Sequence, residues 1–498
     1  MAPLLTKERI VAPPTYNRWL VPPAALAVHL SIGMAYGFSV FWLPLSRAVG
    51  LVRPDPADWK ITTLGWMYTL FFVFLGSSAA IFGAWVEREG PRKAGVVAAC
   101  CWGGGFFVSA LGIYLHQIAL LLAGSGVIGG CGLGLGYISP VSTLIKWFPD
   151  RRGMATGLAI MGFGGGAMIG TPLADLLMRR FATPTSVGVW ETFVVLGALY
   201  FVAMMAGAWG YRLPPPGWSP RRSMPVSSTT PAARNVPVHL AWTTRQFWLL
   251  WAVLCLNVSA GIGVLGMASP MIQEVFRGRV TASAAAGFAG VLSLFNIAGR
   301  IFWASLSDRL GRRLTYTIFF ALGFTLYASV PLTAAAGSLA LFVAIFCIIL
   351  TMYGGGFATI PAYLADLFGA GHVSAIHGRL LTAWSTAGVL GPVLVNYIRE
   401  FQIGHGVPQA QAYNVTMYVL AALLATGLLC NLAVRPVDER LFTLATPARA
   451  STSTAADVAH PAPAAGQWGL VAAAWLLVSA PLAWGIVKTL ALAIQMFR

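Results

Sequence analysis

Charged side chains are scarce in this sequence. Asp, Glu, Lys and Arg make up 9% of its 498 residues, whereas 57% are hydrophobic, with a mean hydropathy of +0.74. A soluble domain carries about 25% charged residues, so the composition excludes an ordinary soluble protein. Apolar runs of about 20 residues recur along the chain, and each is long enough to cross a bilayer core. We therefore expect an all-α membrane protein with many spans.

Residue types that bind metals or form catalytic sites are also few. All six cysteines lie in apolar runs without a Cys-x-x-Cys pair, which is typical of small buried hydrophobic residues and not of a disulfide or metal framework. Met267 and Met271 lie one helical turn apart, but no Cys or His cluster accompanies them, so a copper site is not expected. No nucleophile–base set is visible. We expect no metal, no cofactor and no enzymatic activity.

The charge that is present is mostly positive, with 32 Lys and Arg against 15 Asp and Glu. If the N-terminus is placed in the cytoplasm, 21 basic residues fall in cytoplasmic segments and 8 in segments on the opposite side. This asymmetry follows the positive-inside rule and accounts for the basic balance without nucleic acid. Together with a composition rich in Ala, Arg and Trp, it predicts a multi-pass protein of a bacterial inner membrane with a cytoplasmic N-terminus.

Stretches rich in Pro, Ser, Thr and Ala divide the chain. A polar arm (1–18) precedes six spans within 19–211, and a linker (212–245) precedes six more within 246–435. Such a linker cannot build a packed core and is expected to be flexible. A second tail (436–466) and one last apolar segment (467–494) follow, and the latter contains no charge before Lys488. The predicted spans are 19–46, 62–86, 94–115, 118–145, 153–178, 188–211, 246–273, 283–306, 313–333, 338–364, 376–399, 411–435 and 468–487.

The two groups of spans repeat at a distance of about 221 residues. Glu87 and Asp308, which end equivalent spans, are 221 residues apart, and so are Pro140 and Pro361. A parallel repeat of six spans predicts the major facilitator fold, in which two six-helix bundles are related by a pseudo-two-fold axis. The last apolar run would add a thirteenth, C-terminal transmembrane helix.

A charged motif ends the second span of each half. The copies read Gly83-Ala-Trp-Val-Glu-Arg-Glu-Gly-Pro-Arg-Lys93 and Ala304-Ser-Leu-Ser-Asp-Arg-Leu-Gly-Arg-Arg313. Both resemble the major facilitator signature Gly-x-Leu-x-Asp-Arg-x-Gly-Arg-Arg. A carboxylate at a helix end beside arginines can pair with a neighbouring helix and hold the cytoplasmic side shut; topology signalling by positive charge is the alternative. The predicted gate residues are Glu87, Arg88, Arg92, Asp308, Arg309 and Arg312.

Four further motifs point to a family: Arg18-Trp-Leu-Val-Pro-Pro through His29, Gly33-x-x-Tyr36-Gly-Phe-Ser39, Trp147-Phe-Pro-Asp-Arg-Arg-Gly153 and Asn296-x-x-Gly-Arg300. As a set they resemble the oxalate/formate antiporter family, which is akin to the monocarboxylate carriers, over about residues 16–435. The resemblance implies exchange or uptake of small carboxylates by alternating access. The final run resembles the small single-span companion proteins found with some members. We expect the carrier to work as a monomer.

The resemblance assigns the carboxylate to an arginine of the eighth span, and Arg300 matches it. A buried arginine costs about 2.5–3.5 kcal/mol at a helix centre, and a bidentate carboxylate would offset that cost. Hydrogen bonds to helix carbonyls are the structural alternative. Oxalate exchangers have a lysine in the eleventh span, within Thr-Ala-Lys, where this chain reads Thr382-Ala-Trp384. A single cation favours a monoanion such as formate, lactate or pyruvate over oxalate.

Coupling to protons or to a counter-anion stays open. Asn296 stands one turn before Arg300, where eukaryotic monocarboxylate carriers have an aspartate, and no carboxylate lies in the middle of a span. Arg300 or His29 could take part in proton transfer, although a buried, hydrogen-bonded histidine is the alternative for His29. His377 and Arg379 lie near the cytoplasmic end of their span and are not expected to replace the lysine.

The resemblance also implies aromatic residues around the site, because Tyr36, Tyr137, Tyr353 and Phe357 match positions where the family lines its site with aromatics. A Tyr hydroxyl can orient a carboxylate while its ring excludes water. General packing is the alternative for each of them. A carboxylate sensor with the same fold is the alternative function, but a sensor needs a signalling domain and none is visible. The predicted substrate-binding residues are Arg300, Asn296, Tyr36, Tyr137, Tyr353, Phe357, Trp384 and His29.

Overall fold

The computed structural model describes residues 5–51, 55–216, 218, 234–444 and 467–493. Within them, thirteen helical segments are long and apolar enough to cross a membrane. The first six spans are formed by α1 (Val21–Ile32) with η3 (Gly33–Phe41), α3 (Ile61–Glu89), α4 (Pro91–Tyr114), α5 (Ile118–Leu121) with η4 (Leu122–Gly129) and α6 (Gly130–Trp147), α7 (Arg152–Phe181), and α8 (Val189–Gly210).

The next six spans are formed by α10 (Arg245–Val275), α11 (Ala282–Leu310), α12 (Arg312–Ala335), α13 (Leu339–Phe368), α14 (Val373–Leu380) with α15 (Thr382–Gly404), and α16 (Asn414–Leu432); α17 (Gln467–Ala493) is the thirteenth. The short helices are η1 (Lys7–Ile10), η2 (Arg18–Leu20), α2 (Trp42–Leu45), α9 (Val238–Ala241), η6 (Gln409–Gln411) and η7 (Glu439–Leu441). The all-α fold with twelve spans and an additional C-terminal one is confirmed.

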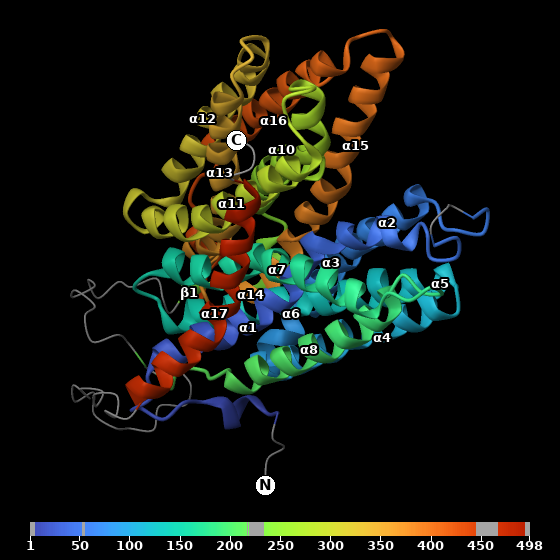
Figure 1. The fold of residues 1–498 in the computed structure, drawn as a ribbon. Helices are drawn as coiled ribbons and strands as arrows, with labels where there is room; N and C mark the ends of the chain where they lie inside the picture. The colour runs from blue at the N-terminus through green and yellow to red at the C-terminus, as the bar shows by residue number, and fades with distance from the viewer. Residues whose placement is uncertain (1–4, 52–54, 217, 219–233, 445–466, 494–498) are drawn as a thin grey trace, which may run out of the picture.

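The helices up to α8 and those from α10 to α16 form two bundles, here called the N and C bundles, which meet along α3, α7, α11 and α14 (Figure 1). Small residues let these helices approach closely. A Cβ added at Gly153 of α7 would lie 2.0 Å from the carbonyl oxygen of Ala304 on α11, and one at Gly378 of α14 would lie 2.1 Å from that of Ala79 on α3. The glycines therefore fix the contact between the bundles.

The first span differs from the continuous helix predicted for 19–46. The α-helix ends at Ile32, and a nine-residue 3₁₀ helix, η3, continues it to Phe41. Runs of 3₁₀ helix longer than three or four residues are uncommon. This segment lies against α7 so closely that a Cβ at Gly33 would come within 2.3 Å of the Phe163 carbonyl oxygen. The close approach places Tyr36 beside α7.

The linker and the tail are joined to each other where the structure describes them. Strand β1 (Arg234–Asn235) of the linker pairs antiparallel with β2 (Thr443–Leu444) of the tail. Next to β1, the Val236 amide donates to the Phe368 carbonyl at 2.9 Å. The end of the linker and the start of the tail are thus paired, and the flexibility predicted for the connector as a whole stays a prediction. Residues 219–233 and 445–466 lie outside the described residues.

Candidate functional site

Arg300 lies fully buried on α11, where that helix faces the N bundle. Its Nε donates to Oδ1 of Asn296, one turn earlier, at 3.1 Å, and its Nη1 donates to the carbonyl of Ile160 on α7 at 2.8 Å. The i,i+4 spacing places Asn296 on the same helix face as Arg300. Nη2 has no hydrogen-bond partner. The guanidinium therefore connects the two bundles and keeps one nitrogen for a further acceptor.

No carboxylate neutralises this arginine among the described residues, because none of their ion pairs includes it. Removing an ion from water costs several kcal/mol unless a counter-charge compensates. Burial without a counter-ion is thus an unfavourable arrangement that an anion would relieve.

Aromatic rings surround the guanidinium. The rings of Phe163 on α7 and Phe357 on α13 lie 5.8 and 5.6 Å from its central carbon, within range of cation–π attraction. Trp384 on α15 packs on Phe357 with centroids 4.5 Å apart and on Tyr137 of α6 at 5.2 Å. The Tyr137 hydroxyl and the Trp384 indole nitrogen are buried without a hydrogen-bond partner. Both are therefore available to a polar ligand.

A hydrogen bond between two tyrosines closes this aromatic cluster across the bundles. The hydroxyls of Tyr36 on η3 and Tyr353 on α13 are 3.1 Å apart. We call the set of Arg300 and these rings the central cluster; it consists of Tyr36, Tyr137, Phe163, Arg300, Tyr353, Phe357 and Trp384. The predicted site contained all of these residues except Phe163. The one sequence feature that sets Phe163 apart is that it is the single aromatic residue in the glycine-rich run 153–170.

Two histidines border the central cluster. Nδ1 of His29 contacts the Ala159 carbonyl on α7, and Nε2 lies 3.2 Å from the Tyr137 carbonyl. This agrees with the alternative of a buried, hydrogen-bonded histidine. The ring of His377 on α14 lies 5.9 Å from that of Tyr137, and its Nε2 is buried without a partner. His377 therefore borders the cluster from α14, the first part of its span, and it was not among the predicted binding residues.

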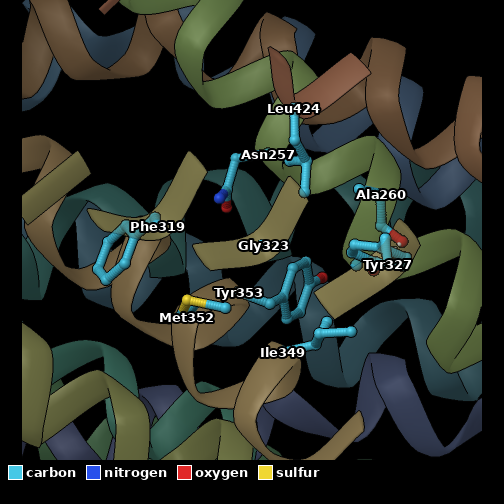
Figure 2. Close-up of a pocket in the computed structure, with 10 residues that line it drawn as sticks. Asn257, Ala260, Phe319, Gly323, Tyr327, Ile349, Met352, Tyr353 and Leu424 are labelled. Carbon is cyan, nitrogen blue, oxygen red and sulfur yellow. Dashed lines mark hydrogen bonds between the residues drawn. The ribbon is translucent and has the colours of Figure 1, made fainter. Parts of the chain in front are cut away.

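The small cavity in Figure 2 lies inside the C bundle and is lined by Tyr353 but not by Arg300. It is bordered by Asn257 and Tyr327 and has a volume of about 10 Å³. That is close to the lower limit for one water molecule, and Oδ1 of Asn257 lacks a partner. The cavity can thus hold a water molecule but not an organic anion.

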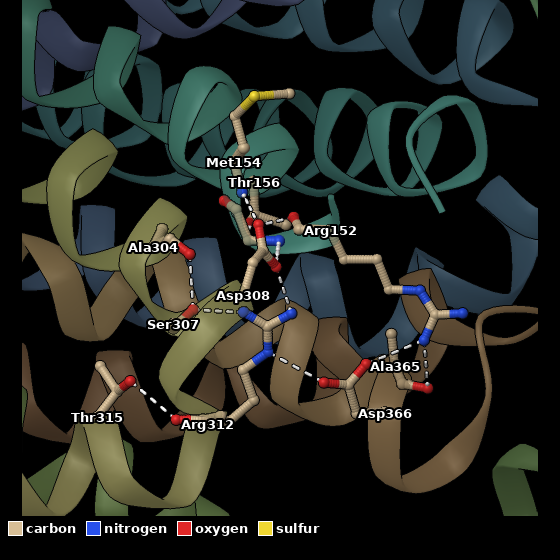
Figure 3. A network of polar contacts seen from close by, with 12 residues as sticks. Arg152, Met154, Thr156, Ala304, Ser307, Asp308, Arg312, Thr315, Ala365 and Asp366 are labelled. Carbon is tan, nitrogen blue, oxygen red and sulfur yellow. Dashed lines mark hydrogen bonds and ion pairs between the residues drawn. The ribbon is translucent and has the colours of Figure 1, made fainter. Parts of the chain in front are cut away.

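The bundles are held together at the end where the linker lies, here called the linker end. Asp308 at the end of α11 accepts hydrogen bonds from the amides of Gly153 and Met154, at 2.8 and 2.9 Å, in the first turn of α7 (Figure 3). A carboxylate at a helix N-terminus satisfies free amides and the helix dipole. Arg312 donates to the same carboxylate at 2.6 Å.

The repeat produces the same arrangement on the other side of the pseudo-axis. Glu87 at the end of α3 accepts the Ser374 amide at the start of α14 at 2.9 Å, and Lys146 donates to it at 2.9 Å. The two acidic residues of the repeated motif therefore each bind the first turn of a helix in the opposite bundle.

A third ionic contact was not predicted. Asp366 at the end of α13 pairs with Arg312 and with Arg152 of α7, both at 3.0 Å (Figure 3). Arg152 and Asp366 meet because the fold brings together the end of α13 and the starts of α7 and α12. Lys146, at the end of α6, joins the contact region through Glu87. Their sequence signal was limited to charge at the ends of spans.

Three of the predicted gate residues lie elsewhere. Arg92 donates to the carbonyls of Trp209 and Tyr211, at 3.1 Å each, within the N bundle. The reason is that the end of α8 presents unsatisfied carbonyls to it. Within the described chain, Arg88 and Arg309 form no hydrogen bond or ion pair with the opposite bundle. Glu87, Asp308 and Arg312 do lie in the contact region.

Comparison with known proteins identifies the family. Residues 24–392 match the Major Facilitator Superfamily. Because this match covers most of the chain, the protein belongs to that superfamily and is a multi-pass membrane transporter. The Escherichia coli fucose:proton symporter FucP has the same fold, with a TM-score of 0.59 and 13% identity over 84% of this chain and all of that one. The family consists of transporters and not of enzymes.

Three curated relatives are similar over most of their length. They are the oxalate:formate antiporter of Oxalobacter formigenes (25% identity, 75% of this chain and 83% of that protein), the uncharacterised transporter YhjX of Escherichia coli (24%, 73% and 83%) and human monocarboxylate transporter 11 (25%, 77% and 77%). The resemblance inferred from the sequence motifs is confirmed.

Proposed function

We propose that this protein is a secondary carrier of small monocarboxylates, such as formate, lactate or pyruvate, which bind at Arg300 between the bundles. The observation that carries the proposal is the free Nη2 of a fully buried arginine without a counter-ion, enclosed by aromatic rings. A carboxylate there would accept charge-assisted hydrogen bonds from the guanidinium. Tyr137 and Trp384 would supply its remaining hydrogen-bond donors.

The number of charges favours a monoanion. Arg300 is the only permanently charged member of the central cluster, and Trp384 occupies the position at which a second cation was sought. A monoanion neutralises the arginine, whereas a dianion would leave one buried charge unpaired. Exchange of oxalate for formate is the second candidate, supported by the name of one relative.

Contacts between the bundles support alternating access. Those described above extend from Glu87 and Asp308 at the linker end to the depth of Arg300 and the Tyr36–Tyr353 pair. We place the linker end in the cytoplasm of a bacterial inner membrane, in agreement with the positive charge on that side. The conformation is then outward-facing, and rocking of the bundles about the central cluster would move the anion across.

Uptake into proteoliposomes tests the proposal. Labelled formate, lactate, pyruvate and oxalate would be compared in wild type, Arg300→Ala and Arg277→Ala, an exposed arginine remote from the cluster. We expect Arg300→Ala to lower uptake of at least one monocarboxylate by about tenfold or more, since charge-assisted hydrogen bonds contribute about 1.5–3 kcal/mol. Equal uptake by both variants would make Arg300 structural. Strong oxalate exchange would refute the argument from one cation.

A further inference from the structure

The helix α17 crosses from one bundle to the other. It packs on α1 and α7 of the N bundle and on α11 of the C bundle. Figure 1 shows it in red, running obliquely from the vicinity of α1 towards α11. We call the line along which α7 and α11 pack the seam. A helix attached to one bundle alone would be carried passively during rocking, but α17 contacts both sides of the seam.

The first part of α17 is fixed to the N bundle. Oε1 of Gln467 accepts the Asn17 amide at 2.7 Å, and the Trp475 indole donates to the Trp19 carbonyl at 3.2 Å. Further along, Gly485 approaches α7 so closely that an added Cβ would lie 2.7 Å from the Met168 carbonyl oxygen. Small residues of this kind permit close helix packing in membranes.

The last part of α17 reaches the C bundle. A Cβ added at Gly290 of α11 would lie 2.6 Å from a methyl group of Thr489. Gly290 lies in the first third of α11, remote from Asp308 at the linker end. Among the described residues, the hydrogen bonds between the bundles themselves do not extend beyond the central cluster towards this end. The contact through α17 therefore adds a connection between the bundles at a level where their described residues form no hydrogen bond with each other.

The attachment is limited to a few points. A cavity of about 670 Å³, almost wholly apolar, separates Leu477, Val478 and Pro481 of α17 from α1, α7 and α8. Leu477, which lines this cavity, is 77% exposed, so its side chain is not packed on the bundle. A helix held by a few close contacts beside a large cavity can separate from the bundle without disturbing its core.

Rocking must change these contacts. Closing the open end would bring the first part of α11 and the last part of α7 together, and α17 contacts α11 and α7 at Gly290 and Met168. A binding partner that contacts one conformation better than another shifts the equilibrium towards the first. A Cβ added at Gly165 of α7 would lie 2.9 Å from Leu482 of α17. We propose that the seam surface around Met168, Gly165 and Gly290 is a docking site for α17 in the conformation described here, and that docking keeps the linker end closed and slows the transport cycle.

This inference rests on the proposed transport function, and its test uses the full-length protein. Gly485→Leu places a large side chain against the Met168 carbonyl. Gly469→Leu is the matched control, because no atom lies within 4 Å of a Cβ added there. Both changes add the same apolar side chain to the same helix. Gly290→Leu is a second variant that disturbs the contact from the C bundle.

Two readouts separate this inference from the choice of substrate. Hydrogen–deuterium exchange at Gly153 and Met154, whose amides bind Asp308, reports opening of the linker end in any membrane mimetic. We expect Gly485→Leu and Gly290→Leu to accelerate exchange there by about fivefold or more, a typical size of coupling between sites, and to raise the uptake rate. Gly469→Leu should match the wild type.

Other outcomes overturn the inference. If hydrogen–deuterium exchange at Gly153 and Met154 is the same in Gly485→Leu as in the wild type, the docking of α17 does not affect opening of the linker end. An equal acceleration in α12, which has no close contact with α17, would show that α17 serves folding instead. If the wild type takes up no carboxylate, the proposed substrate class fails, while the exchange experiment still decides whether α17 controls the linker end.

Discussion

His29 and Arg300 contact neighbouring carbonyls of the same helix, those of Ala159 and Ile160 on α7. One comes from the N bundle and the other from the C bundle. The chain of α7 thus lies between a histidine and an arginine at the depth of the central cluster. Movement of α7 relative to α11 must break or replace the hydrogen bond from Arg300 to the Ile160 carbonyl. The contact between His29 and the Ala159 carbonyl lies within the N bundle and can persist during that movement.

The His29 contact predicts a difference between two substitutions. A glutamine can donate from both amide hydrogens to the carbonyls of Ala159 and Tyr137, whereas a leucine leaves both without this donor. We expect His29→Leu to be less stable than His29→Gln by about 1–3 kcal/mol. Thermal unfolding in detergent measures the difference. Equal midpoints would mean that the two contacts contribute nothing to stability.

Asp308 predicts the behaviour of the linker end. In Asp308→Asn the charge that binds the first turn of α7 and Arg312 is lost, so the closed state should weaken. Because hydrogen bonds to charged groups contribute about 1.5–3 kcal/mol, exchange of the Gly153 and Met154 amides should accelerate about tenfold or more. Asp438→Asn is the control, since that carboxylate caps only η7. Similar exchange in both variants would contradict a gate role.

Phe163 was absent from the site predicted by sequence, and its cation–π contact gives it a measurable role. Phe163→Leu keeps the apolar volume approximately but removes the ring beside Arg300. A loss of about 0.5–2 kcal/mol would raise the KM for uptake by about two- to thirtyfold. Phe107→Leu, on the exposed side of α4, should leave the KM unchanged. An unchanged KM in Phe163→Leu would place that ring outside the substrate site.

Gly157 tests the close approach of the bundles. A Cβ there would lie 2.7 Å from the Arg300 carbonyl oxygen, whereas one at Gly104 of α4 meets no atom within 4 Å. Gly157→Ala should therefore reduce both stability, by about 1–3 kcal/mol, and uptake. Gly104→Ala should be neutral or slightly stabilising because alanine favours helix. Tolerance of Gly157→Ala would show that the bundles can separate there without loss.

Trp384 tests the argument from charge. Trp384→Lys places a second cation beside Arg300, so the site should gain oxalate uptake and lose preference for monocarboxylates. Trp384→Phe keeps an aromatic ring and is the control for the loss of volume; it should keep the original preference. Uptake of several labelled acids, measured in parallel, reports the ratio. A Trp384→Lys variant that keeps the original ratio would show that charge number does not select the substrate.

The sequence by itself determined the class of the protein, its spans, its repeat and its buried arginine. The length and composition of an apolar run can be read directly from the sequence. Because the bilayer thickness sets the length that a span must have, these two properties identify the spans. The positions of Glu87 and Asp308 followed from the repeat distance. The family resemblance supplied the aromatic positions that the fold then brought around Arg300, and their role in binding stays a prediction.

Tertiary structure alone decided which of these side chains meet. Phe163 lies in the central cluster and His377 borders it because α7 packs on α11, and α14 packs on α3, through glycines between the two bundles. The pairing of Asp366 with Arg152 and Arg312 depends in the same way on three helix ends meeting. The place of α17 on the seam depends on close packing at Gly290 and Gly485, and a hydrophobic pattern without charge carries no information about the face on which such a helix packs.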